Sequence, residues 1–280
     1  METGRRVTLA GGGAVIESAW VSRGESITWE GPAGEVQGWF YPPTNPEFTA
    51  PAGDLPPLIT MTHGGPTAFA DNSFALRTQF WTSRGFAVLD VNYSGSAGLG
   101  RAYRNRLRGQ WGVLDVADVV AGATALAERG LVDGARLAIR GGSAGGYTTL
   151  RALTTSRVFS VGVSLYGIGD LSALASDTHK FESRYLDSMI GAWPEAEQLY
   201  RDRSPIHHLD QLTCPMLLLQ GADDAVVPPN QAHAMAEAVR AKGLEVELIV
   251  FEGEGHGFRK AATIAAALAA ELAFYRRVFG

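Results

Sequence analysis

From residue 58 onward, short apolar runs of strand length alternate with segments whose apolar residues recur at helical spacing. The runs cover residues 58–62, 87–91, 137–140, 161–165, 216–220 and 246–251. Runs that are apolar on both faces are typical of a parallel sheet that helices cover on both sides. The alternation therefore predicts an α/β fold with a doubly wound, mostly parallel sheet and helices on both faces.

Four longer segments carry the helical spacing, at residues 112–129, 145–155, 230–242 and 260–278. Residues 170–204 interrupt the alternation and contain several aromatic side chains, so we interpret them as an insertion. Ligands of open α/β sheets bind at the carboxyl ends of the strands. We therefore expect the insertion to lie over a site at that edge of the sheet.

The first part of the chain shows a weaker pattern. Residues 26–30 predict an edge strand, and residues 36–41 predict a second strand that ends at two prolines. We expect residues 1–35 to form an N-terminal extension and residues 36–280 to form one α/β domain. A chain of 280 residues is long enough for such a domain to bury roughly three-quarters of its surface.

Composition excludes several classes of partner. The formal net charge of −5 argues against nucleic acid, because binding phosphates requires a basic face. No apolar run has the length of a membrane span, so we expect no membrane partner. The single cysteine, Cys214, allows no intrachain disulfide, and we expect a cytoplasmic protein. We expect no metal and no cofactor, and association into a homo-oligomer stays an open alternative.

A serine lies in a glycine-rich turn between a predicted strand and a predicted helix. The sequence GGSAG at residues 141–145 has the pattern G-x-S-x-G, and it stands in the strand–turn–helix context that this pattern requires. Small residues keep side chains away from a hydroxyl that must stand clear of the sheet. The following helix points its positive end at the same place. We identify Ser143 as the candidate nucleophile of an α/β-hydrolase fold.

A serine hydroxyl needs a base, and the base needs a partner that orients it. In this fold the order along the chain is serine, acid, histidine. Of the six histidines, only His256 follows the last predicted strand. Residues 221–228 (GADDAVVP) follow the preceding strand and offer two acids. We favour Asp224 over Asp223, because Asp224 stands at the usual place for the acid on this turn.

A second glycine turn follows the first strand of the alternation. The sequence HGGP at residues 63–66 can bring a backbone N–H to the nucleophile. We assign an oxyanion hole to the N–H groups of Gly65 and of Ala144, the residue after the serine. We expect His63 to shape this loop rather than to act as a base.

These motifs together resemble one known family. HGGP, GGSAGGY at residues 141–147, GADDAVVP and GHGF at residues 255–258 are similar to the catalytic domain of the prolyl oligopeptidase family of serine peptidases. NYSGS at residues 92–96 and GQWG at residues 109–112 resemble its acylaminoacyl-peptidase and dipeptidyl-peptidase branch. The resemblance covers about residues 36–279. It implies hydrolysis of short peptides or acylamino acids through an acyl-enzyme on Ser143, and it implies that Tyr166 lines the pocket for the residue before the scissile bond.

The sequence departs from the family's pattern at two points. Full-length relatives carry a β-propeller before the hydrolase domain, whereas residues 1–35 here are the end of such a domain or a short extension. Many relatives also place Arg or Asn two residues after the acid, where this chain has Val226. A carboxylesterase or thioesterase acting on small molecules therefore remains the alternative, because the same triad serves both reactions.

Overall fold

The structure is a computed structural model that describes residues 16–177 and 185–280. Eight strands of the described part form one sheet, in the order β1-β2-β4-β3-β5-β6-β7-β8. The strands are β1 (Glu25–Gly31), β2 (Gly34–Tyr41), β3 (Leu58–Thr62), β4 (Ala87–Asn92), β5 (Leu137–Gly142), β6 (Val161–Leu165), β7 (Met216–Gly221) and β8 (Val246–Phe251). The β1–β2 and β2–β4 pairs are antiparallel and the other pairs are parallel. The predicted mostly parallel sheet of an α/β-hydrolase fold is confirmed.

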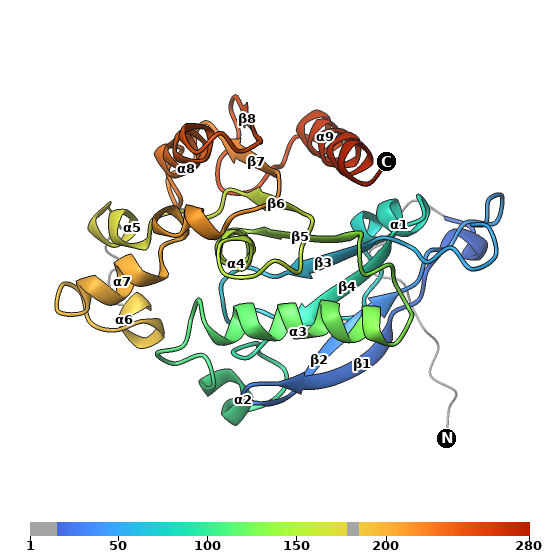
Figure 1. The fold of residues 1–280 in the computed structure, drawn as a ribbon, viewed down its shortest axis with the longest axis horizontal. Helices are drawn as coiled ribbons and strands as arrows, with labels where there is room; N and C mark the ends of the chain where they lie inside the picture. The colour runs from blue at the N-terminus through green and yellow to red at the C-terminus, as the bar shows by residue number, and fades with distance from the viewer. Residues whose placement is uncertain (1–15, 178–184) are drawn as a thin grey trace, which may run out of the picture.

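Helices cover both faces of this sheet (Figure 1). They are α1 (Leu76–Thr82), α2 (Arg101–Asn105), α3 (Leu114–Glu128), α4 (Ala144–Leu153), α5 (Leu171–Asp177), α6 (Tyr185–Met189), α7 (Glu197–Arg203), α8 (Asn230–Ala241) and α9 (Ala261–Phe279). Side chains of α3, α4 and α8 belong to the hydrophobic cluster on one face, and side chains of α1 and α9 to the cluster on the other. Every residue of β3 and β6 is buried, which explains why these strands are apolar at successive positions.

The four predicted helices correspond to α3, α4, α8 and α9, with ends that differ by at most two residues. Helices α1 and α2 were not predicted. They have seven and five residues, too few for a helical period to stand out from the sequence.

The N-terminal hairpin joins the sheet at its edge. Strand β1 pairs with β2 along its whole length, from Glu25 opposite Phe40 to Gly31 opposite Gly34. The boundary predicted at residue 36 falls inside this hairpin, so β1 shares its hydrogen bonds with the α/β domain. Residues 1–15 of the predicted extension lie outside the described residues.

The described part of the insertion contains α5, α6 and α7, and hydrogen bonds to main-chain carbonyl groups hold it against the loop before α3. The guanidinium of Arg203 donates to the carbonyl oxygens of Trp111 and Gly109, at 3.0 and 2.9 Å. The hydroxyl of Tyr147 on α4 donates to the carbonyl oxygen of Arg203 at 3.0 Å. These bonds tie the insertion to the helix that follows the candidate nucleophile. No helix in the described ranges is long and apolar enough to cross a membrane.

Candidate active site

Ser143 lies between β5 and α4 in a strained turn. Its φ of 57° is a left-handed value that few residues other than glycine adopt. Its N–H donates to the carbonyl oxygen of Leu165 at 3.0 Å, which fixes the turn to β6. A Cβ on Gly145 would collide with the carbonyl oxygen of Thr62 and lie 2.8 Å from that of His63. The glycine is therefore required because β3 runs directly past the turn.

A chain of hydrogen bonds starts at the serine hydroxyl. The Oγ of Ser143 lies 2.8 Å from Nε2 of His256, and Nδ1 of His256 lies 2.8 Å from Oδ2 of Asp224. The Asp224 side chain is fully buried, whereas 23% of the His256 side chain is exposed. The three predicted residues are thus brought together in the order hydroxyl, imidazole, carboxylate, although 113 residues separate serine from histidine.

The loop after β7 fixes the Asp224 carboxylate. Its Oδ1 accepts hydrogen bonds from the N–H groups of Val226 and Val227, both at 2.9 Å. The side-chain amide of Gln220 donates to Oδ2 at 3.3 Å. Oδ1 is therefore turned toward the backbone and Oδ2 toward His256.

Asp223, the other candidate acid, is exposed. Its side chain makes no hydrogen bond or ion pair within the described residues, and its N–H donates to the carbonyl oxygen of Glu254 at 2.9 Å. The carboxylate of Glu254 in turn accepts the N–H groups of Arg259 and Lys260, both at 2.9 Å. Asp223 thus helps to join the acid loop to the histidine loop through its backbone alone.

The HGGP loop lies against the nucleophile turn. A Cβ built on Gly64 would be 3.1 Å from the carbonyl oxygen of Gly142 and 3.5 Å from Cβ of Ser143. Gly65 has a φ of +64°, which turns the chain at this point. In the part of the chain that the structure describes, the N–H groups of Gly65 and Ala144 donate to no protein acceptor. Both are free to donate to a ligand.

His63 holds this loop in place through its contacts with Tyr93 and Ser96. Its ring stacks on Tyr93, with centroids 4.2 Å apart, and its Nε2 lies 2.7 Å from Oγ of Ser96. The Tyr93 hydroxyl donates to the carbonyl oxygen of His63 at 2.8 Å. Burial lowers the pKa of His63 to about 4, so the ring is neutral at physiological pH.

Tyr166 follows β6 with a φ of 40°. Its N–H donates to the carbonyl oxygen of Leu219 at 2.7 Å. Its ring meets His256 edge to face, with centroids 5.0 Å apart, and packs against Phe258 at 5.4 Å. The tyrosine therefore borders the imidazole from the face of the sheet that α1 and α9 cover.

Comparison with known proteins places the chain in a family. The model of the prolyl oligopeptidase family matches residues 72–280. The chain belongs to this family. Among relatives in the family, dipeptidyl aminopeptidase BIII of Pseudoxanthomonas mexicana is 31% identical over 210 residues, which are 73% of this chain and 30% of that protein. Dipeptidyl peptidase family member 6 of Caenorhabditis elegans is 33% identical over 72% of this chain and 28% of its own length.

Two solved structures of the family are similar over nearly the whole chain. A puromycin-hydrolyzing peptidase of Mycobacterium tuberculosis has a TM-score of 0.93 and 51% identity, and the match covers 95% of this chain and 40% of that one. A puromycin hydrolase has a TM-score of 0.93 and 48% identity, with 96% and 41% covered. The chain thus spans less than half the length of the family members that it matches.

Several residues of this family site were not predicted from sequence. Gln220 contacts the acid, Phe258 supports Tyr166, and Tyr93 and Ser96 hold His63. Each acts through a contact between segments that are distant in the chain or through packing. Phe258, Tyr93 and Ser96 had a local signal, since they lie in the GHGF and NYSGS motifs, whereas Gln220 had none. No group of three or more potential metal-ligating side chains is arranged around a common point in the described ranges.

Proposed function

We propose that this chain hydrolyses amide bonds of short peptides or acylated amino acids through an acyl-enzyme on Ser143. The observation that carries the proposal is the continuous hydrogen-bond chain from Ser143 through His256 to Asp224. A serine hydroxyl becomes a nucleophile when a neutral imidazole stands at hydrogen-bond distance with its other nitrogen held by a carboxylate.

In the first step, Nε2 of His256 takes the hydroxyl proton while Oγ of Ser143 bonds to the carbonyl carbon of the substrate. The carbonyl oxygen becomes an oxyanion, for which the N–H groups of Gly65 and Ala144 are the proposed donors. The carboxylate of Asp224 holds Nδ1 protonated and stabilises the imidazolium. His256 then returns the proton to the leaving amine, and the carbon–nitrogen bond breaks.

In the second step, a water molecule loses a proton to Nε2 of His256, and its oxygen attacks the acyl-enzyme carbonyl. Collapse of the second oxyanion releases the carboxylic acid, and the proton returns to Oγ of Ser143. Tyr166, whose ring packs against the imidazole, is the proposed border of the acyl pocket. No cofactor enters either step, and each bond that breaks is matched by one that forms.

Amide hydrolysis is favoured over ester hydrolysis by the relatives. Family members that match this chain are named for dipeptidyl aminopeptidase and acylamino-acid-releasing activity, and structures at 48–51% identity are named for puromycin hydrolysis. Substrates that present an amide after an aminoacyl or acylaminoacyl group are therefore the class that we propose for this chain.

The test is one panel of rates. Aminoacyl p-nitroanilides, N-acetyl-aminoacyl p-nitroanilides and short-chain p-nitrophenyl esters are compared at equal enzyme concentration, with Ser143→Ala as the control. We expect at least one amide to be turned over with a kcat/KM near that of the best ester, and the variant to be inactive on all three. Turnover of esters alone would replace the peptidase by the carboxylesterase alternative.

A further inference from the structure

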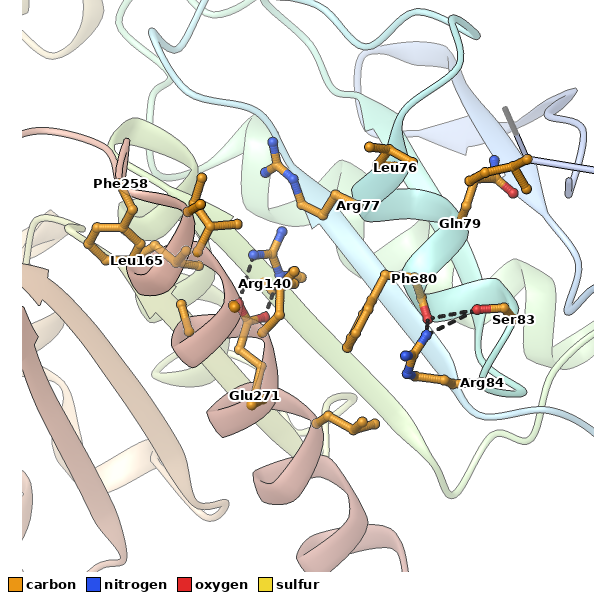
Figure 2. A pocket seen from close by; sticks show the side chains of 18 of the residues that line it. Leu76, Arg77, Gln79, Phe80, Ser83, Arg84, Arg140, Leu165, Phe258 and Glu271 are labelled. Atoms are coloured by element: carbon orange, nitrogen blue, oxygen red, sulfur yellow. Dashed lines mark hydrogen bonds and ion pairs between the residues drawn. The ribbon is translucent and has the colours of Figure 1, made fainter. Parts of the chain in front are cut away.

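A large cavity lies between α1 and α9, on the face of the sheet opposite α3 and α4. Its volume is about 990 Å³, which lies at the upper end of the range for small-molecule sites. Its apolar lining includes Leu268 and Leu272 on α9. Phe80 on α1 contributes to it as well (Figure 2). A cavity with this apolar lining is suited to a hydrocarbon chain or a row of apolar side chains.

Charged groups also line this cavity. Arg140, on β5, makes two hydrogen bonds to the carboxylate of Glu271 on α9, at 2.7 and 3.0 Å. Only 4% of the Arg140 side chain and 1% of the Glu271 side chain are exposed. This buried pair lines the cavity, and its two hydrogen bonds hold the guanidinium and the carboxylate against each other.

Arg77, on α1, is an exposed cation that lines the cavity. Figure 2 draws its side chain beside that of Arg140. Within the described residues, its guanidinium makes no hydrogen bond and no ion pair, and its pKa is lowered mainly by the positive charge of Arg140. The neighbouring acid, Asp90, has a pKa raised to about 7 by burial and does not line the cavity. A planar guanidinium of this kind fits the two oxygens of a carboxylate.

Arg84, at the other end of α1, is already engaged. It donates to the carbonyl oxygen of Phe80 at 2.9 Å and to Oγ of Ser83 at 3.1 Å, and it lies 3.8 Å from the centre of the Phe80 ring. Both arginines are thus without an ion pair in the described ranges, but Arg84 is held by neighbouring groups, whereas Arg77 makes no hydrogen bond there.

We propose that this cavity binds an amphipathic carboxylate, with its head group on Arg77 and its apolar part between α1 and α9. The ligand could be a fatty acid or the free carboxyl end of an apolar peptide, since both present the same chemistry. The site is separate from the reacting atoms of Ser143. Tyr166 and Phe258 line the cavity and form the partition between it and His256.

The experiment is calorimetric titration of the full chain with dodecanoate, with dodecanol as the uncharged probe and N-acetyl-Leu-Phe as the peptide acid. Arg77→Gln is compared with Arg84→Gln, which removes the same charge from the other end. A charge-assisted pair contributes about 1.5–3 kcal/mol, so Arg77→Gln should weaken binding of the acid about 10- to 100-fold. Arg84→Gln should change it less than about threefold, and dodecanol should bind equally to all three proteins.

A second variant tests the place of the apolar part. Ala265→Trp fills the cavity from an exposed position on α9, and thermal unfolding checks that the variant is folded. It should abolish binding of the acid. Binding of dodecanoate alone identifies a fatty acid site, and binding of the peptide acid alone identifies a peptide carboxylate site. Absence of binding by both acids, or equal binding by wild type and Arg77→Gln, would overturn the proposal. Ser143→Ala should bind as the wild type does, so this result is independent of the proposed reaction.

Discussion

Replacing Asp224 by asparagine changes one atom of the site, and its effect follows from the bonds that the carboxylate makes. Oδ1 accepts the N–H groups of Val226 and Val227. Turning the new amide around would face its NH₂ toward both N–H groups, at a cost of roughly 2–6 kcal/mol for two unsatisfied donors. The amide oxygen therefore stays at the backbone, and the NH₂ group takes the place of Oδ2 facing His256.

An NH₂ group at that place can only donate, so Nδ1 of His256 must lose its proton and Nε2 must carry one. The ring then presents N–H to Ser143 and cannot accept the hydroxyl proton. We expect kcat to fall about 10⁴-fold with the fold retained, because the wrong tautomer removes the base.

The measurement is the steady-state rate on the best substrate of the panel, with thermal unfolding to compare stability. Asp223→Asn is the matched control, since it makes the same chemical change on the exposed neighbour and should leave kcat within about twofold. A variant of Asp224 that keeps kcat within tenfold of the wild type would refute the tautomer argument. A 10⁴-fold loss in Asp223→Asn would assign the acid to that residue instead.

Two further predictions concern stability. Glu271→Gln should lower the unfolding free energy by about 3–5 kcal/mol in denaturant titrations, because it leaves Arg140 buried without its counter-charge; the exposed control Glu245→Gln, opposite Arg277, should cost less than about 1 kcal/mol. Burial raises the pKa of Asp90 from 3.8 to about 7, so in the wild type stability is lost as pH rises between these values. Asp90→Asn should remove that loss. Between pH 4.5 and 7.5, the unfolding free energy of the variant relative to that of the wild type should therefore rise by about 2 kcal/mol, a value that allows for the partial exposure of Asp90. If the unfolding free energies of the wild type and of Asp90→Asn changed equally with pH, this prediction would be wrong.

The main features of the fold were predictable because each had a local cause. The inner strands of the parallel part, such as β3 and β6, are buried on both faces, so their sequences are apolar at successive positions. The candidate nucleophile, base and acid each follow a strand, and in this topology the carboxyl ends of neighbouring parallel strands meet at one edge. Ser143, Asp224 and His256 could therefore be assigned by their place after β5, β7 and β8 before any distance was known.

The features that could not be predicted from the sequence depend on distances between helices and on packing. The cavity between α1 and α9 is lined by Arg140 and Glu271, which pair although they are 131 positions apart in the chain. Arg77 is exposed in the structure, and it lies on a segment of seven residues that is too short to predict as a helix. The ring contact between Tyr166 and His256 depends on a left-handed backbone value at a residue that is not glycine.

The central claim is that Ser143 is the nucleophile, and covalent labelling tests it most directly. A fluorophosphonate probe forms a bond only with a serine that a neighbouring base activates. Peptide mass spectrometry of the labelled chain should find one probe on the peptide that contains Ser143, and Ser143→Ala should take up none. Labelling of the variant at the wild-type rate, or labelling of the wild type at another serine, would contradict the account.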